Sequence, residues 1–399
     1  MKVLTAFIDG LKPESLKYMD FLGSFSEKRR IRSEFGYSNP AHASMYTGVH
    51  PNKHHYWFIW QHSPKTSPFR QIEKLRLQKF SNNIYYKYGI YKIISKTHPE
   101  ITSFYGIPFL YWIPLSSWKF FDLSEKKFWT DPQYSPDYPT IFDRLHLHKI
   151  PYETIGLTKI NAGNSSDIIQ KHNPDVLKDW TYLFFGDIDP LSHKFCQSSK
   201  EVITRLKKID TIIERYYKKF ESELDEFCLM VYSDHGHINV KSSVNLYDVF
   251  KNKNSSINNF KFFIDSNFAR FWVQSDTEYE YIESILDSIG DKGFILSDVM
   301  QKKYHVNMPD NRYGDLIYYL DTPYVFDRGT ITSFGRKIKG IDASAHGYLP
   351  EYPDSDGVFI TNRKIKTSSH IELVDILPSI MDNFKVPIPN NLDGSIIWK

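Results

Sequence analysis

The sequence predicts an α/β fold, with a central, mostly parallel sheet flanked by helices. Short, continuous apolar runs recur along the chain, too short for helices and too continuous for half-exposed antiparallel strands. They are Val3–Ile8, Tyr182–Phe185, Cys228–Tyr232 and Val358–Ile360. Between them lie segments whose apolar residues recur three or four positions apart, such as Thr140–Leu147 and Val202–Phe220. Alternation of such strands and helices indicates an open α/β sheet.

Two stretches depart from this alternation and divide the chain into parts. Residues 56–138 are rich in aromatic residues and prolines without a sustained period, and we interpret them as an inserted cap. Their aromatic side chains either fill a core or contact a substrate. Residues 244–340 show an α+β pattern and are interpreted as a smaller inserted lobe. The catalytic core would then comprise residues 1–55, 139–243 and 341–399.

Bulk properties restrict the function classes only weakly. The formal net charge of the 399-residue chain is +3, so no basic surplus favours a nucleic acid duplex as partner. The only two cysteines, Cys196 and Cys228, cannot form a disulfide framework, and Cys228 suits a reduced core thiol. The first apolar stretch is too short for a signal peptide and no stretch approaches a transmembrane segment, so we expect a cytoplasmic protein.

Three aspartates stand where the predicted strands end. Asp9, Asp189 and Asp234 each follow an apolar run, and the carboxyl ends of parallel strands meet at one edge of a sheet. Three carboxylates crowded at that edge would repel one another unless cations lay between them. The pattern therefore predicts a metal site.

Histidines accompany these carboxylates. His193 follows Asp189 by four residues, His235 directly follows Asp234, and His346 lies in a separate Ala-His-Gly segment. Mixed carboxylate and imidazole ligands favour zinc (Zn²⁺), with Mn²⁺ second, over magnesium or calcium. Each histidine taken alone also suits a structural role, and it is their joint pattern that indicates metal ligation.

The candidate nucleophile is Ser38, in the segment Gly36–Gly48. Ser38 suits an N-cap and Pro40 a first helical turn, so a helix should begin here and run to about Thr47. The amide N–H groups at a helix N-terminus favour a bound phosphate and a serine alkoxide. From this segment alone, Ser38 could equally be a simple helix cap.

These motifs together resemble the alkaline phosphatase superfamily, and within it the type I phosphodiesterase and nucleotide pyrophosphatase branch. The resemblance spans nearly the whole chain in the family's order, through Asp9-Gly10, Ser38–His54, Asp189–His193, Ser233–Gly236, His346–Tyr348, Val374–Pro378 and Leu392–Gly394. It implies two divalent metal ions and a phosphoseryl intermediate. One metal would be held by Asp189, His193 and His346, and the other by Asp9, Asp234, His235 and the oxygen of Ser38.

The chain departs from that branch at three positions. Serine replaces the branch's usual threonine nucleophile, and Tyr56–Trp60 occupies the stretch where an asparagine usually contacts phosphate. Asn39 stands at the substrate-binding position that is often aromatic in nucleotide-cleaving members. The departures leave open whether the small-molecule phosphate ester carries a nucleotide, a sugar or a lipid head group, and whether it is a mono- or diester.

Alternative functions remain open at this point. A sulfatase would need an arginine where His42 stands, and a phosphoglycerate mutase a larger inserted domain. A phosphotransferase could pass a phospho-alcohol group to a glycan, and a non-catalytic relative could bind a glycan or lipid. Five basic residues could meet an anionic group, although a solvated charged face is the competing interpretation; they are Lys53, His54, His55, Arg70 and Lys74.

Overall fold

The computed structural model describes residues 1–74, 77, 83–102, 110–157, 164–173, 176–327, 331–333, 336–338, 342–366 and 370–399. The predicted domain boundary at residue 341 and the side chain of Lys74 lie outside these described residues. The chain forms two compact units. Unit 1 comprises residues 1–54, 128–239 and 342–399, and unit 2 comprises residues 55–127 and 240–341.

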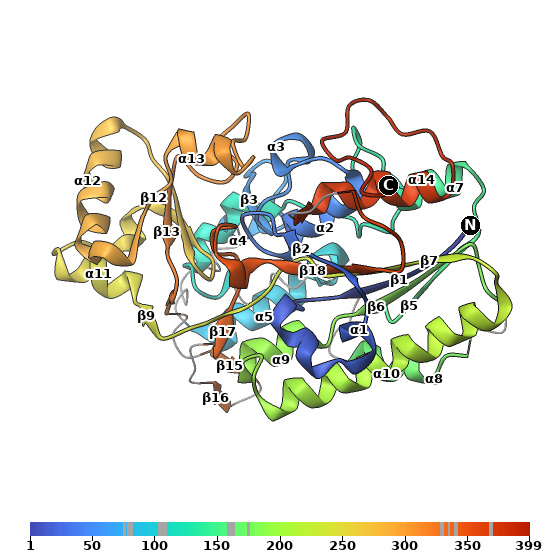
Figure 1. The fold of residues 1–399 in the computed structure, drawn as a ribbon. Coiled ribbons are helices and arrows are strands. Elements are labelled where there is room, and N and C mark those ends of the chain that lie inside the picture. Colours follow the sequence, from blue (N-terminus) through green and yellow to red (C-terminus); the bar gives the residue numbers. More distant parts are fainter. Residues whose placement is uncertain are drawn as a thin grey trace. The chain divides into compact units, whose positions relative to one another are not determined.

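Unit 1 contains a seven-stranded sheet in the order β19-β2-β18-β7-β1-β6-β5, which confirms the predicted α/β class (Figure 1). Parallel pairs join β1 to β6 and β7, β5 to β6, and β19 to β2. The strands are β1 (Lys2–Ile8), β2 (Glu27–Arg32), β5 (Tyr152–Ile155), β6 (Trp180–Phe185), β7 (Phe227–Tyr232), β18 (Gly357–Thr361) and β19 (His370–Glu372).

The direction of β18 was predicted wrongly. The run Val358–Ile360 was expected to form a parallel strand, but β18 is antiparallel to both β7 and β2. All five of its residues are buried because it lies inside the sheet. A continuous apolar run indicates that both faces of a strand are buried, and it does not indicate whether the strand is parallel or antiparallel to its neighbours.

Helices cover both faces of this sheet. On one face, α10 packs against β1 and β7 and contacts α1, α8 and α9. On the other face, α2, α7 and α14 pack together. The helical elements of unit 1 are η1 (Pro13–Tyr18), α1 (Asp20–Gly23), α2 (Ser38–Thr47), α3 (Pro51–His54), α7 (Ile141–Leu147), α8 (Ser165–Lys171), α9 (Ile188–Phe195), α10 (Lys200–Glu223), η8 (Pro353–Ser355), η9 (Leu373–Asp375) and α14 (Ile376–Asn383).

The long helix α10 shows why the periodic segments fold as predicted. Ser199 caps it by accepting a hydrogen bond from the amide of Val202. Its buried residues, among them Leu206, Ile209 and Ile213, recur three or four positions apart and enter the core beneath the strands. The predicted helix Thr140–Leu147 is also confirmed as α7, where Thr140 and Asp143 form a capping box.

Unit 2 is built around a four-stranded antiparallel sheet in the order β10-β11-β13-β12. Its hydrophobic core includes Trp60 and Trp118 from the first inserted segment and Phe262 and Phe271 from the second. Its elements include β3 (Trp60–His62), α4 (Gln71–Lys74), α5 (Ile84–Ile94), η3 (Pro99–Thr102), η4 (Leu115–Phe120), β4 (Phe121–Leu123), β9 (Ser242–Val244), α11 (Leu246–Asn252), η6 (Ile257–Asn259), β10 (Lys261–Ile264), β11 (Phe268–Trp272), α12 (Asp276–Leu286), η7 (Asp287–Lys292), β12 (Gly293–Ile295), α13 (Asp298–Lys303), β13 (Leu316–Leu320), β14 (Tyr324–Phe326), β15 (Ile331–Ser333) and β16 (Arg336–Ile338).

Many of the aromatic residues of the predicted cap fill this core. Trp57, Trp60 and Trp118 are fully buried, whereas Tyr85 is 63% exposed. The domain boundaries stay a prediction, although the structure places most of the predicted cap and the predicted lobe in one unit and residues 128–138 in the other.

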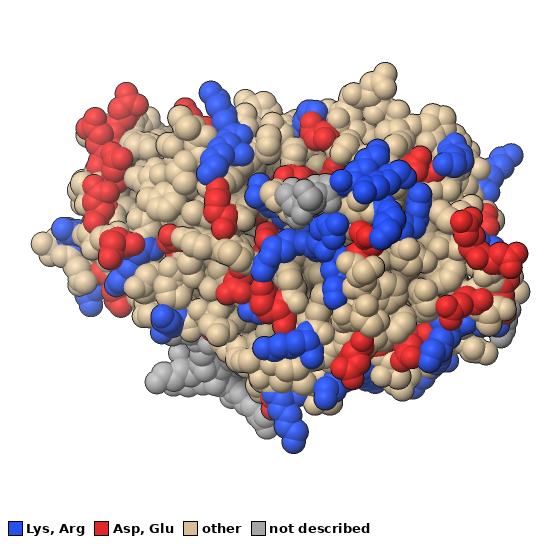
Figure 2. All heavy atoms as spheres, in the orientation of Figure 1, with Lys and Arg blue, Asp and Glu red and all other residues tan. Residues whose placement is uncertain are grey.

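Ion pairs compensate part of the positive charge of β2. Lys and Arg side chains gather near the centre of the face shown in Figure 2, with acidic side chains between them. On β2, Arg30 pairs with Glu14 and Asp356, and Arg32 lies 3.9 Å from Glu372. Exposed pairs of this kind contribute little to stability.

No helix among the described residues is long and apolar enough to cross a membrane.

Candidate metal centre

The predicted aspartates do meet at one edge of the sheet in unit 1. Asp9 directly follows β1, and Asp234 lies two residues beyond β7, its parallel neighbour. Asp189 lies in the first turn of α9, which follows β6 on the other side of β1. The carboxyl ends of these strands therefore bring together three carboxylates that are far apart in the sequence.

A carboxylate-rich group forms around the ends of β1 and β7 and consists of Asp9, Asp234, His235 and Ser38. His235 Nε2 lies 3.2 Å from Asp234 Oδ2, 3.7 Å from Asp9 Oδ1 and 3.1 Å from Ser38 Oγ. Asp9, Asp234 and His235 are all buried and offer ligand atoms close enough to share one ion.

An imidazole-rich group surrounds Asp189 and consists of Asp189, His193, His237 and His346. Asp189 Oδ1 lies 3.3 Å from His193 Nε2, 3.1 Å from His237 Nε2 and 3.4 Å from His346 Nε2. Asp189, His193 and His237 could hold a metal together, and so could Asp189, His235 and His346. The two groups are thus continuous through His235, whose ring stacks on that of His346.

Gly10 permits the close approach of β1 to this cluster. Its φ of +73° is a left-handed conformation that side chains disfavour, and an added Cβ would lie 2.9 Å from His237 Nε2. Its amide donates a hydrogen bond to Asp234 Oδ1 at 3.2 Å. The Asp-Gly pair at the end of β1 thus supplies a carboxylate and room for an imidazole.

Partners at Nδ1 orient three of the four rings. His193 Nδ1 faces Asp342 Oδ2 at 3.3 Å, and His235 Nδ1 donates to the carbonyl of Gly236 at 3.0 Å. His237 Nδ1 lies 3.2 Å from Ser344 Oγ. In each case Nε2 is the nitrogen that faces Asp189 or Asp234. This is the arrangement in which outer partners fix the tautomer of metal-binding histidines.

Burial and mutual repulsion shift the pKa values of these groups. Burial, reinforced by the charges of Asp234 and Asp189, raises the pKa of Asp9 well above its usual value. Burial opposes protonation of His193, but the nearby carboxylates of Asp189 and Asp342 outweigh it and raise the pKa to about 10. Burial lowers the pKa of His346 well below its usual value. The shifts favour the protonated forms of Asp9 and His193 and the neutral form of His346.

The buried oxygen atoms fit the predicted divalent metals. Asp9 Oδ1 and Asp234 Oδ2 are buried and have no hydrogen-bond partner. A buried carboxylate oxygen without a partner is costly, and a cation at this position would satisfy it. The donor set of carboxylate oxygens and imidazole nitrogens is also one that binds zinc or manganese.

Ser38 is the first residue of α2, and the predicted end of this helix at Thr47 is confirmed. The prediction that Ser38 is the N-cap is wrong. Tyr37, with an extended backbone, is the cap residue, and no side chain caps the helix. The Ser38 hydroxyl faces His235 instead, so it lies in the carboxylate-rich group at the helix N-terminus. Asn39 follows it with a half-buried side chain.

The basic residues after this helix have other partners. Lys53 pairs with Asp393, and His54 Nε2 lies 3.1 Å from Ser44 Oγ. Arg70 donates to the carbonyl of Lys65 at 2.7 Å. An anion-binding role for these residues stays a prediction.

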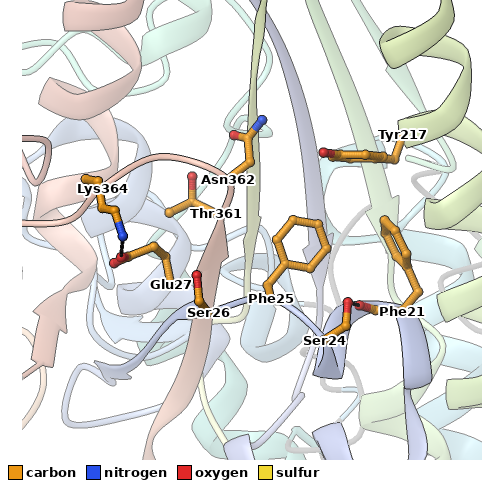
Figure 3. A pocket seen from close by; sticks show the side chains of 9 residues that line it. All are labelled: Phe21, Ser24, Phe25, Ser26, Glu27, Tyr217, Thr361, Asn362 and Lys364. Carbon is orange, nitrogen blue, oxygen red and sulfur yellow. Dashed lines mark hydrogen bonds and ion pairs between the residues drawn. The ribbon is translucent and has the colours of Figure 1, made fainter.

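A surface pocket in unit 1 is separate from the metal centre. Glu27 of β2, Tyr217 of α10 and Thr361 of β18 line it, together with Lys364, which follows β18 (Figure 3). The antiparallel strand β18 ends at Thr361, which pairs with Met230 in β7, so the pocket lies toward the amino ends of the parallel strands. The metal centre lies at their carboxyl ends.

Two residues of the centre were missed from the sequence. His237 follows His235 in a His-Gly-His segment, and this spacing was the available signal. Asp342 precedes His346 by four residues, but nothing in the local pattern linked it to His193. Their place in the centre depends on the pairing of β17 (Ser344–Ala345) with β8 (Ile238–Asn239), which aligns the segment after Asp342 with the segment after His237.

The fold and the cluster together define a protein of the alkaline phosphatase superfamily. The model of the type I phosphodiesterase/nucleotide pyrophosphatase family matches residues 8–349. The chain belongs to this family. No curated protein sequence matches it.

Solved structures support the same fold. Human ectonucleotide pyrophosphatase/phosphodiesterase 5 is 12% identical, with a TM-score of 0.65 over 99% of this chain and 97% of that chain. An inactive variant of the murine protein, solved in complex with AMP, is 12% identical with a TM-score of 0.67 over 99% and 97% of the two chains. At this identity the likeness concerns the fold.

Proposed function

We propose that the chain is a two-metal phosphoester hydrolase of the phosphodiesterase and nucleotide pyrophosphatase type, with Ser38 as its nucleophile. One observation carries the proposal. The Ser38 hydroxyl lies at the N-terminus of α2 and 3.1 Å from His235 Nε2, inside a group of three buried candidate metal ligands. A serine that only capped a helix would have no reason to face such a group.

Two divalent metals, zinc or manganese, would be held by the residues on the page. Asp9, Asp234, His235 and Ser38 would hold one, and Asp189, His193 and His346 the other. Bound metals of this kind lower the pKa of a coordinated hydroxyl or water and neutralise phosphate charge. The unpartnered oxygens of Asp9 and Asp234 support this assignment.

The chain's own residues would then perform a double displacement. Ser38 Oγ attacks phosphorus, the Oγ–P bond forms, and the bond to the leaving oxygen breaks. The alcohol departs with the proton that Ser38 loses. Amide N–H groups at the start of α2 point toward the phosphate and stabilise its charge. Water then cleaves the seryl phosphoester and returns a proton to Ser38.

Family membership and the site support a proposal for the substrate class. The murine relative was solved with AMP, and we propose a nucleotide derivative or a phosphodiester as the substrate of this chain. Asn39, the second residue of α2, would contact the phosphate or the group next to it. An amide hydrogen-bonds to polar groups and stacks poorly on a base, so Asn39 favours a polar neighbour over a nucleobase at this position.

The test is to trap the covalent intermediate. The zinc- and manganese-loaded proteins are mixed with p-nitrophenyl thymidine monophosphate, bis-p-nitrophenyl phosphate or p-nitrophenyl phosphate. They are then quenched in acid, and the peptide containing Ser38 is weighed by mass spectrometry. We expect p-nitrophenolate release, diester turnover above monoester turnover, and a mass increase on Ser38 equal to the retained phosphoryl group.

Controls separate the nucleophile from the fold. Ser38→Ala should lose both turnover and the adduct, whereas Ser38→Thr keeps a hydroxyl and should retain measurable activity. Turnover with no adduct on Ser38, and undiminished activity in Ser38→Ala, would contradict the proposed nucleophile. A folded, metal-loaded protein that cleaves none of the three esters would contradict the hydrolase proposal.

A further inference from the structure

The imidazole-rich group contains one more histidine than the family resemblance assigns. His237 has a fully buried side chain, and its Nε2 lies 3.1 Å from Asp189 Oδ1, closer than Nε2 of either His193 or His346. Asp189, His193 and His237 offer ligand atoms that all lie within 4.8 Å of one another. A buried imidazole with this placement needs either a proton to give or a metal to bind.

Hydrogen bonding around Ser344 indicates which nitrogen of His237 carries the hydrogen. Ser344 Oγ lies 2.7 Å from the carbonyl oxygen of Ser192 and donates its only hydrogen there. Toward His237 Nδ1, at 3.2 Å, the same hydroxyl oxygen must therefore accept. The ring hydrogen is then on Nδ1.

This tautomer leaves a lone pair on Nε2, directed at Asp189. A carboxylate oxygen is also an acceptor, so two lone pairs would face each other across 3.1 Å. Such a contact is unfavourable unless a cation lies between the two atoms. The Nε2 atom of His193 faces the same oxygen of Asp189, at 3.3 Å.

The backbone maintains this placement. β8 and β17 pair through Asn239 and Ser344, which holds Ser344 against His237. The left-handed Gly10 leaves the space that His237 Nε2 occupies. His237 is thus fixed from two sides with Nε2 toward Asp189.

We propose that His237 Nε2 is a further ligand of the metal at Asp189, so that this metal takes three imidazoles and one carboxylate. The proposal rests on the two-metal function above and adds a residue to it. Four protein ligands are typical of tightly held zinc, whereas three with an open position are typical of catalytic zinc. We infer that the ion at Asp189 is retained strongly and acts mainly by orienting and neutralising phosphate.

Counting coordinated imidazoles tests the proposal directly. The protein is loaded with Co²⁺, and its proton NMR spectrum in water is searched for strongly shifted ring N–H signals, one per coordinated histidine. We expect four, from His193, His235, His237 and His346, and three in His237→Asn. Metal content and competition with a chelator are measured in parallel. His237→Asn should weaken one of two Zn²⁺ ions by more than the roughly 10–100-fold that loss of an outer partner costs.

The matched control is His54→Asn, which removes another buried histidine of unit 1 whose partner is Ser44. It should leave four shifted signals and both affinities unchanged. Two bound metals with only three shifted signals in the unmodified protein would overturn the role of His237 while the two-metal function stands, and this count does not depend on any variant folding. Failure to bind two metals would overturn both proposals.

Discussion

The two halves of the candidate metal centre are built from different ligands. The carboxylate-rich group places Asp9, Asp234 and one imidazole beside Ser38. The imidazole-rich group surrounds a single carboxylate, Asp189, with imidazole nitrogens. Both halves are at the same edge of the same sheet, so their difference arises from side chains and not from position in the fold.

Charge explains what this difference does. Two carboxylates balance one dication, so the half that contains Ser38 is close to neutral when loaded. One carboxylate leaves the other half positive, which favours an anionic phosphate beside it. Carboxylate oxygens suit manganese, whereas imidazole nitrogens suit zinc. We therefore expect the imidazole-rich group to prefer zinc and the carboxylate-rich group to accept either metal.

The largest expected effect concerns Ser38, which belongs to one half only. Ser38→Ala should lower kcat by on the order of 1,000-fold or more, because loss of a nucleophile removes the covalent route. Both metals should stay bound, because the carboxylates and imidazoles are unchanged. Steady-state kinetics together with metal analysis checks this, and an undiminished kcat in Ser38→Ala would contradict the proposed nucleophile.

Removing one carboxylate, in either half, should weaken the binding of the ion in that half and leave the other ion bound. Asp234→Asn is expected to leave one tightly bound zinc, and Asp189→Asn to leave one ion that manganese replaces readily. Asp210→Asn is the control, since this buried aspartate of unit 1 accepts hydrogen bonds from the amides of Phe21 and Leu22, away from the centre. Elemental analysis after dialysis gives the ratio, and equal metal loss in Asp234→Asn and Asp189→Asn would mean that the halves are one cooperative site.

A smaller effect should follow from changing an outer partner. Asp342 faces His193 Nδ1 at 3.3 Å, and Asp342→Asn removes its charge but keeps its size. Loss of such a partner typically costs about 10–100-fold in metal affinity. Chelator competition should show this loss for the zinc-preferring ion alone. Weakening of both ions to the same degree would contradict the division into halves.

The smallest expected effect, counted per unit of pH, is the change of metal affinity with pH. The carboxylates of Asp189 and Asp342 raise the pKa of His193 to about 10 against the opposing effect of burial, so the metal-free protein holds this proton at neutral pH. Metal binding must release it, and affinity should rise with pH by up to about tenfold per unit until the pH approaches that pKa. Calorimetry between pH 6 and 9 in buffers of different ionisation enthalpy measures the protons released. Affinity independent of pH would mean that His193 binds no metal.

Many residues of the candidate centre could be predicted from the sequence, because the end of a strand can be recognised from the local sequence pattern. Asp9 and Asp234 follow apolar runs directly, and parallel pairing then brings them together. The antiparallel direction of β18 was not accessible, because its burial pattern is the same in either direction. His237 and Asp342 were not accessible either, because their roles depend on the long-range pairing of β8 with β17.

The joint core of unit 2 is a second example. Trp60 and Trp118 pack in one cluster with Phe262 and Phe271, although more than a hundred residues separate the two segments. Hydrophobic periodicity reports which side of an element is buried and not which distant element covers it. The sequence pattern therefore supported two separate inserted segments where the structure has one compact unit.

The central claim is that two metal ions occupy two unlike halves of one centre. It is tested most directly by crystals of the zinc-loaded protein, soaked in manganese and measured with anomalous scattering at both metal edges. The account predicts two peaks, with zinc retained within ligand distance of Asp189, His193 and His237 and manganese partly replacing zinc beside Asp9 and Asp234. A single peak, or equal exchange at both positions, would contradict it.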